Sequence, residues 1–340
     1  MSKVLSFGEL LLRICPDSAG EWLQENSFPV YVGGAEANVA AALALWEIPS
    51  AYMTAIPDNF IARQLAGYLD QLNVDTTAIQ YGGERIGLYF LDKGKDLKNA
   101  GVIYDRKYSS FAELKVGTIN WDEVFEGVSW FHFSAICPAI NQEVADVCEE
   151  ALKAASAKNI TISIDLNYRA KLWKYGKEPG DVLPALVQYC DLLMGNVWAA
   201  ERMLNIPVSD TLVEEHNKAA YLAQSQISSK AILDQFPKCK AVANTFRFDH
   251  GTMGIQYYTT LYTKDQLFVS KEYISELIAG KVGSGDCFMA GLIYGFYKKL
   301  SSQEIVDFAT AAAFAKLFTE SDFNTTKFED ILSIVEQYES

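Results

Sequence analysis

Short apolar segments alternate along this chain with alanine-rich segments of helical length, and this alternation limits the fold more than any other feature. The apolar segments are 4–7, 51–56, 130–133, 161–165, 192–194 and 241–244, and helices are expected near 37–46, 61–72 and 142–156. Strands separated by helices form βαβ units, in which successive strands run parallel and the helices cover both faces of the sheet. We therefore predict an α/β fold with a doubly wound, mostly parallel sheet and helices on both faces.

Two segments, 10–33 and 84–111, interrupt this alternation. They have the pattern of strands and turns without crossover helices, so they can pair with one another into a small separate sheet. The chain has 340 residues, half of them apolar, which is enough to bury one large core. We expect a single domain over residues 1–340 that carries this small sheet as an appendage.

Composition excludes several classes of partner. The formal net charge of −14 argues against nucleic acid and anionic membranes, because both require a basic surface. The six cysteines form no C-x-x-C pair and no two of the three histidines have the spacing of a zinc site, so we expect reduced thiols and no structural metal. No run of 18 apolar residues is present, and the N-terminus enters a short strand directly. We expect a cytoplasmic protein.

A glycine-rich loop precedes an apolar helix near the C-terminus, with the sequence K-V-G-S-G-D-C-F-M-A-G over residues 281–291. Backbone N–H groups in such a loop can bind an anion, and the helix N-terminus adds a partial positive charge. The loop is neither a dinucleotide fingerprint, since G-x-G-x-x-G counted from Gly283 ends at Phe288, nor a Walker A loop, in which the lysine follows the glycines. The segment predicts a phosphate site in which Asp286 is either a base or only a helix cap.

Residues 282–291 resemble the D-T-x-G-A-G-D-x-F-x-A-G segment of the ribokinase-type (PfkB) carbohydrate kinases. The resemblance implies a ribokinase-like fold with a small β-lid and a kinase that uses ATP and Mg²⁺. It also implies that Asp286 is the catalytic base. The backbone of Gly283, Ser284 and Gly285 would stabilise the transferring phosphoryl group.

The nucleotide-binding half matches this family less closely. The leading Asp-Thr of the family is Gly280-Lys281 here, and we expect Lys281 to add its own charge. The family's N-x-x-E motif, which helps to place Mg²⁺, is approximated by residues 196–201 with two extra residues, and Glu201 is expected to act on the metal through water. The resemblance implies the following nucleotide-binding residues: Asn196, Glu201, Thr245, Gly251, Gly254, Lys281, Gly283 and Gly285.

A Gly-Gly turn opens an alanine-rich helix near the N-terminus. On its own, such a turn usually has no further role. In the resembled family, however, the G-G-x-x-x-N segment lies under the sugar and its Asn contacts hydroxyl groups. The resemblance therefore implies that Gly33, Gly34 and Asn38 bind the substrate.

The strand over residues 161–165 leads into polar residues at alternate positions, Asp165, Asn167 and Arg169. They share one side if the chain stays extended, and ligands of open α/β sheets bind beyond the carboxyl ends of strands. An ordinary surface pair of Asp165 and Arg169 is the alternative. The sequence D-x-N-Y-R-x-x-L-W resembles the 2-keto-3-deoxygluconate kinase branch of the family. This implies that the planar guanidinium of Arg169 contacts the substrate carboxylate.

Further matches to this branch lie in the interrupting segments and near the C-terminus. Residues 87–89 and 102–106 resemble its lid, from which Tyr89, Tyr104 and Arg106 would contact the keto acid. Packing within a sheet is the alternative for each tyrosine. Residues 321–324, S-D-F-N, resemble the branch's G-D-F-N. Lids of this family exclude water and often pair into dimers, so we expect a homodimer through the lid.

These observations predict an ATP-dependent kinase of the terminal C6 hydroxyl of a sugar acid, with 2-keto-3-deoxygluconate as the expected substrate. One alternative is a kinase of a neutral sugar such as fructose or ribose. Arg106 and Arg169 argue against it, because two cations facing an uncharged ligand would be unpaired. The other is a catalytically silent sugar-binding protein, which the departures at Gly280, Lys281 and residues 196–201 would allow. We expect an ordinary pKa for Asp286, because a dissociative transfer removes the hydroxyl proton late.

Overall fold

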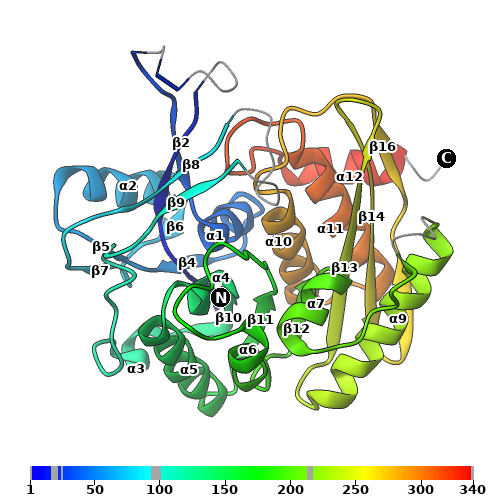
Figure 1. Ribbon diagram of the computed structural model, residues 1–340, viewed down its shortest axis with the longest axis horizontal. Coiled ribbons are helices and arrows are strands. Elements are labelled where there is room, and N and C mark those ends of the chain that lie inside the picture. Colours follow the sequence, from blue (N-terminus) through cyan, green and yellow to red (C-terminus); the bar gives the residue numbers. More distant parts are fainter. Residues whose placement is uncertain (1, 17–21, 24–25, 93–100, 213–216, 338–340) are drawn as a thin grey trace.

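The computed structural model describes residues 2–16, 22–23, 26–92, 101–212 and 217–337. Ten strands form the main sheet, in the order β15-β14-β13-β12-β11-β10-β1-β4-β6, and β16 also pairs with β14 (Figure 1). Their bounds are β1 Lys3–Phe7, β4 Ser50–Met53, β6 Val74–Asp75, β10 Val128–Ser134, β11 Thr161–Asp165, β12 Leu192–Gly195, β13 Ala241–His250, β14 Gly254–Thr263, β15 Gln266–Val269 and β16 Tyr273–Ser275.

All neighbouring strands from β13 to β6 are parallel, whereas β14, β15 and β16 pair in antiparallel fashion. The predicted mostly parallel sheet is confirmed. The segment 51–56, expected to be one strand, is divided at Thr54. The Thr54 hydroxyl accepts from the backbone N–H of Leu10 and its carbonyl from that of Gln80, so the chain leaves the main sheet there. The next two residues, β5 Ala55–Ile56, pair instead with β7 Gln80–Tyr81.

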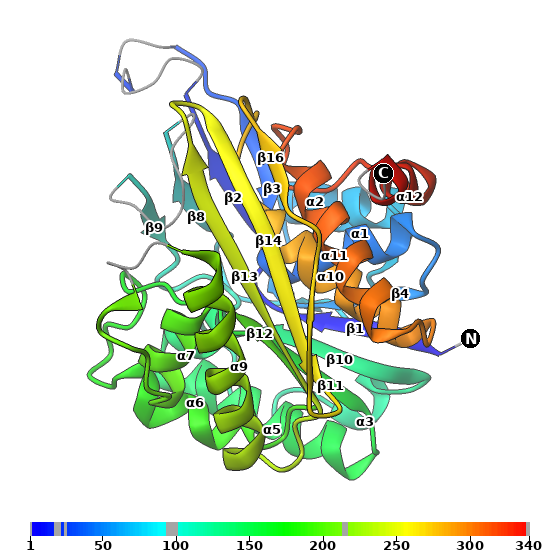
Figure 2. The same ribbon diagram turned by 90° about the vertical axis from the view of Figure 1, so that its right-hand side faces the viewer.

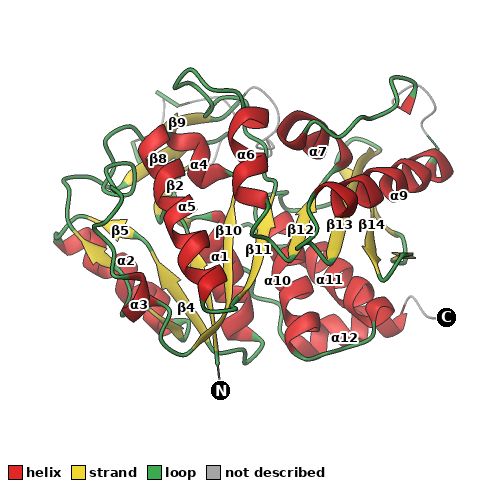
Figure 3. Ribbon diagram, turned by 90° about the horizontal axis from the view of Figure 1, so that it is seen from below, coloured by secondary structure: helices red, strands yellow, loops and turns green. Residues whose placement is uncertain are grey.

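Helices cover both faces of the sheet (Figures 2 and 3). Helices α5, α6, α7 and α9 lie on one face, and α1, α10, α11 and α12 lie on the other. None of the helices in the described part of the chain combines the length and the apolarity that crossing a bilayer requires. The bounds are α1 Ala35–Leu45, α2 Phe60–Gln71, α3 Trp121–Val124, α4 Ile136–Ile140, α5 Gln142–Ala157, α6 Pro179–Val187, α7 Val197–Leu204, α9 Lys218–Gln235, α10 Ser284–Tyr297, α11 Ser302–Lys316 and α12 Phe328–Gln337.

Close packing fixes the position of α10. Gly291 of α10 lies against Ala309 of α11, where a Cβ on the glycine would come within 2.5 Å of the alanine Cα. Any larger residue at Gly291 would therefore push the two helices apart. The N-terminus of α10 is held in this way at the carboxyl edge of the parallel strands.

The described parts of the two interrupting segments form the predicted small sheet; residues 17–21, 24–25 and 93–100 of these segments lie outside the described residues. Its four strands are β2 Leu11–Ile14, β3 Val30–Gly33, β8 Gly87–Phe90 and β9 Ile103–Asp105, in the order β3-β2-β8-β9. Strands β2 and β8 are parallel, and the two outer pairs are antiparallel. We call this sheet the lid. Figure 1 shows it standing apart from the main sheet, beside α1.

Candidate active site

A cavity of about 560 Å³ lies between the lid and the carboxyl edge of the main sheet. Residues that follow β1, β11 and β12 line it, together with the N-termini of α1 and α10 and with Tyr89 and Tyr104 of the lid. Open α/β sheets bind their ligands at this edge. The fold therefore brings the predicted sugar and phosphate segments to one place.

The glycine-rich loop forms an anion cradle at the start of α10. Gly283 is the N-cap of the helix with φ of +77°, and a Cβ there would come within 2.4 Å of the carbonyl oxygen of Asp322. Only glycine fits this position. The first N–H groups of a helix have no partner within it, and Gly283, Ser284 and Gly285 all line the cavity. They can therefore stabilise negative charge on a bound phosphate.

Asp286 is buried in the first turn of α10 and points toward α1 rather than capping its own helix. Its Oδ2 accepts a hydrogen bond of 2.6 Å from Nδ2 of Asn38, whereas no side chain caps α10. Burial raises the pKa of Asp286 to about 7, against the opposing effect of the Asn38 hydrogen bond. The expectation of an ordinary pKa was therefore wrong, because the sequence does not show that the carboxyl group is desolvated.

The Gly-Gly turn has two different roles. Gly34 lines the cavity with φ of +144°, and its carbonyl accepts from the backbone N–H of Asn38 at 2.8 Å. Gly33 is not among the described residues that line the cavity, and a Cβ there would come within 2.9 Å of Oδ2 of Asp322. Gly33 thus allows close packing against Asp322, and its contact with substrate stays a prediction. Within the described chain, the buried Oδ1 of Asn38 has no partner and can accept from a ligand hydroxyl.

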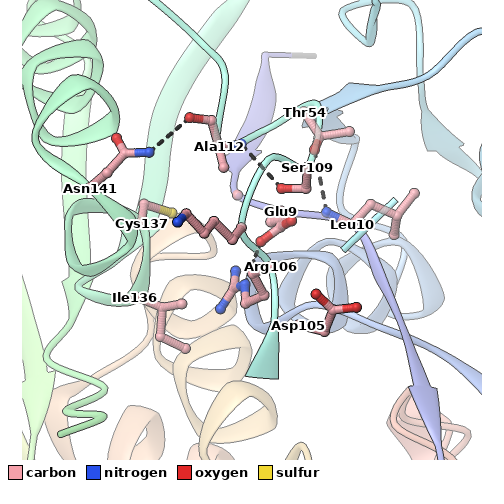
Figure 4. Close-up of polar contacts among 12 residues, drawn as sticks. Glu9, Leu10, Thr54, Asp105, Arg106, Ser109, Ala112, Ile136, Cys137 and Asn141 are labelled. Carbon is pink, nitrogen blue, oxygen red and sulfur yellow. Dashed lines mark hydrogen bonds and ion pairs between the residues drawn. The ribbon is translucent and has the colours of Figure 1, made fainter. Parts of the chain in front are cut away.

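Arg106 lines the cavity, but its charge is already neutralised. Its Nε is hydrogen-bonded to Oε2 of Glu9, and both side chains are buried (Figure 4). The argument that Arg106 would be unpaired beside a neutral sugar was therefore wrong. Sequence reasoning missed Glu9, although an acid just beyond the apolar strand β1 was a usable signal. Oε1 of Glu9 has no partner among the described residues.

Arg169 is the second cation that was predicted to face the substrate, besides Arg106. Together with Asp165 and Asn167 it lines the cavity, as the alternation after β11 predicted. Its Nη1 donates to the carbonyl of Tyr168 at 3.0 Å. Its charge also acts to lower the pKa of Asp286, although burial of that carboxyl group has the larger and opposite effect.

The lid is joined to the C-terminal loop through Asp322. Nη2 of Arg13 in β2 lies 2.7 Å from Oδ1 of Asp322, and the hydroxyl of Tyr89 in β8 donates to Oδ2 at 2.7 Å. The hydroxyl of Tyr89 is therefore already hydrogen-bonded to Asp322. Tyr104 of β9 lies next to Tyr89 and also lines the cavity. The S-D-F-N resemblance had pointed to Asp322 without a role, and nothing in the sequence indicated Arg13.

Only some of the residues predicted to bind the nucleotide line the cavity. Glu201, Thr245 and Asn196 line the cavity, but Oδ1 of Asn196 accepts from the N–H of Ala199 and caps α7. Lys281 also lines it, and its Nζ lies 2.7 Å from Oδ1 of the exposed Asp249. Sequence reasoning missed Arg247, which lines the cavity beside Lys281.

Gly251 and Gly254 do not belong to the described lining of the cavity, and their nucleotide contact stays a prediction. They lie in the turn and at the base of the hairpin between β13 and β14. Gly251 has φ of +62°, and a Cβ on Gly254 would come within 2.2 Å of the carbonyl oxygen of Ser275. Both glycines are required by the backbone of the hairpin.

Comparison with known proteins agrees with this geometry. Residues 1–324 match the model of the pfkB family carbohydrate kinases. The 2-dehydro-3-deoxygluconokinase of Thermotoga maritima is 34% identical with a TM-score of 0.89, and the alignment covers 99% of this chain and 100% of that one. A putative ribokinase II of E. coli in complex with ATP and Mg²⁺ is 18% identical with a TM-score of 0.77, over 99% and 100% of the two chains, which shows the shared fold.

The 2-dehydro-3-deoxygalactonokinase of Haloferax volcanii is 29% identical over 205 residues, which are 59% of this chain and 61% of that protein. The chain thus spans about three fifths of the length of this curated relative. The family model, in contrast, matches nearly the whole chain, including the anion cradle and all four strands of the lid. The ribokinase-like fold is confirmed, and the chain belongs to the pfkB family of carbohydrate kinases.

Proposed function

We propose that this protein transfers the γ-phosphoryl group of ATP to the terminal C6 hydroxyl of a sugar acid, 2-keto-3-deoxygluconate. One observation carries the proposal. A buried carboxyl group with a raised pKa, Asp286, lies at the N-terminus of α10 in the same cavity as the guanidinium of Arg169. A proton acceptor, an anion cradle and a carboxylate-binding cation thus share one site.

Asp286 acts as the base. With a pKa of about 7, it is ionised in part at neutral pH and accepts a hydroxyl proton more readily than an ordinary aspartate. Asn38 holds the carboxylate through Oδ2, which leaves Oδ1 of Asp286 for the sugar hydroxyl. The amides of Gly283, Ser284 and Gly285 stabilise charge on the phosphoryl group.

The residues present fit ATP and Mg²⁺ in part. The cradle accepts a phosphate because Gly283 carries no Cβ, and Thr245 and Glu201 line the adjoining part of the cavity. No group of three or more acidic, His or Cys side chains in the described chain could hold a metal. Mg²⁺ typically binds through substrate phosphates, water and one or two carboxylates, and Glu201 would contact it through water. The ion would neutralise charge on the phosphates.

The substrate class rests on Arg169 and on the relatives. The proteins of T. maritima and H. volcanii are by name kinases of 2-dehydro-3-deoxy sugar acids, which supports an acidic substrate here. Because Glu9 neutralises Arg106, we assign selection of the acid to Arg169; Lys171 also lines the cavity, and its Nζ donates to the carbonyl of Val102. A neutral sugar is the second candidate, because the pairing of Arg106 with Glu9 removes one of the two cations that argued against an uncharged substrate.

The direct test is ATP consumption with a panel of acidic and neutral sugars, followed by ³¹P and ¹³C NMR of the product. Turnover of the keto acid with phosphate on C6 is expected. Preference for fructose or ribose would refute the acid assignment, and inactivity with every sugar would favour a silent binding protein. Arg169→Lys keeps the positive charge but removes the planar guanidinium, which can form two hydrogen bonds with a carboxylate. KM for the acid should therefore rise about 10–150-fold, while KM for neutral sugars should not change.

The same proposal includes a homodimer through the lid and a cytoplasmic location. The outer lid strands carry exposed apolar side chains, Val30 of β3 and Ile103 of β9, at 56% and 65% exposure. Edge strands with such side chains are able to pair with a second copy. Light scattering should give a dimer for the wild type, and Ile103→Lys should shift the mass toward the monomer. A monomeric wild type would contradict this part.

A further inference from the structure

A lysine is fully buried beneath the anion cradle. Lys316 is the last residue of α11 and is 1% exposed. Its ammonium donates to the backbone carbonyls of Val282 at 3.0 Å, Ser321 at 2.6 Å and Thr319 at 3.5 Å. It is not among the described residues that line the cavity, so the phosphoryl transfer proposed above does not use it directly.

Burial of this ammonium is unfavourable by itself. Desolvation lowers the pKa of Lys316, and an apolar side chain would fill the same space without that cost. The C-terminal end of α11 offers some compensation, because the helix dipole favours a cation there. The three carbonyl bonds and the nearby carboxylates of Asp322 and Asp286 also favour the charged form. The sequence thus retains a charge where packing alone does not require one.

The three carbonyls belong to the two loops that shape the site. Val282 precedes Gly283 in the cradle, and Ser321 precedes Asp322, the residue that binds the lid. The carbonyl of Val282 lies in the same peptide group as the N–H of Gly283. A cation on that oxygen polarises the peptide and makes the N–H a stronger donor.

We propose that Lys316 is a positioning residue for phosphoryl transfer. Its buried ammonium holds the cradle loop against the loop of Asp322, so that the N–H groups of Gly283 to Gly285 point at the transferring phosphate. Lys316 acts through these peptide groups and contacts neither substrate. The proposal rests on the kinase function above.

The first test is Lys316→Met, which retains the length of the side chain and removes the charge. Loss of a charge-assisted hydrogen bond corresponds to a fall in kcat of about 10–100-fold. KM for the sugar should change little, because Asn38 and Arg169 are untouched. Lys271→Met is the matched control, since Nζ of Lys271 also donates to a backbone carbonyl, that of Val335 in α12, which does not belong to the cradle loop. It should retain wild-type kcat.

The second test is chemical rescue. Lys316→Ala leaves a cavity beside carbonyl oxygens, which bind small cations. Methylammonium should raise the kcat of this variant several-fold, whereas tetramethylammonium at the same ionic strength should not. A melting temperature and a circular dichroism spectrum will show whether each variant is folded.

The outcomes separate the two proposals. An inactive wild type would refute the kinase function. Wild-type turnover together with unchanged kcat in Lys316→Met would refute only the role of Lys316. A folded Lys316→Ala that is impaired but gains nothing from methylammonium would also overturn it. So would failure of both variants to fold, because the proposal requires that only the alignment of the cradle is lost.

Discussion

The proposed sugar side of the cavity, around Asn38 and Asp286, and the proposed nucleotide side, around Thr245 and Lys281, are built in different ways. On the sugar side, functional side chains are buried and bonded to one another, as in Asn38 with Asp286 and Glu9 with Arg106. On the nucleotide side, Lys281 pairs with Asp249, whose side chain is 80% exposed. The sugar side is therefore preorganised, whereas the nucleotide side relies on backbone groups and on the charge that the ligand brings.

The largest effect should follow removal of the base from the buried side. Asp286→Asn should lower kcat by about 10²–10⁴-fold, because the amide cannot accept the hydroxyl proton. The melting temperature should stay near that of the wild type, since Asp286 does not cap α10. Steady-state kinetics and calorimetry measure both. Retained turnover would show that the buried carboxylate has no chemical role.

The next prediction compares a buried ion pair with an exposed one. Arg13→Met leaves Asp322 buried without its cation and should reduce the free energy of unfolding by about 3–5 kcal/mol. The matched control is Arg63→Met, which breaks an exposed pair with Asp58 and should cost at most about 1 kcal/mol. Urea unfolding of both variants decides. Equal losses would show that burial does not make the pair of Arg13 and Asp322 more important for stability than an exposed pair.

The pH dependence of activity should report the same burial. Asp286 must be ionised to accept a proton, and its pKa is raised to about 7. kcat/KM should therefore rise with pH and level off above about 7, and it should fall about tenfold per unit below that value. A profile that is flat down to pH 5 would mean that the carboxyl group is hydrated in solution.

The smallest effect is expected on the nucleotide side. Lys281→Ala should change KM for ATP by at most about fivefold, because an exposed ion pair is worth about 0–1 kcal/mol and Asp249 already holds the ammonium. Asp249→Asn releases the lysine and should lower KM for ATP, most clearly at low salt. If Lys281→Ala instead abolishes ATP binding, the nucleotide side is preorganised by its side chains in the same way as the sugar side.

Sequence reasoning predicted the fold better than it predicted the contacts within the site. The alternation of apolar and helical segments gave the parallel sheet, because periodicity reports local structure and burial. The motif resemblance predicted that Asp286, Asn38 and Arg169 belong to one site, and all three line the same cavity. It could not show that Glu9 pairs with Arg106, or that Arg13 pairs with Asp322 across 309 positions. Such pairs depend on which distant segments meet in the fold, and a local sequence pattern does not contain that information.

Asp322 contacts both the lid and the anion cradle. Its carboxylate binds two strands of the lid, and its carbonyl oxygen lies against Gly283 of the cradle. A ligand that displaces this one residue must shift both parts together. The binding free energies of sugar and ATP are then coupled, and linkage requires that each substrate change the affinity of the other by the same factor.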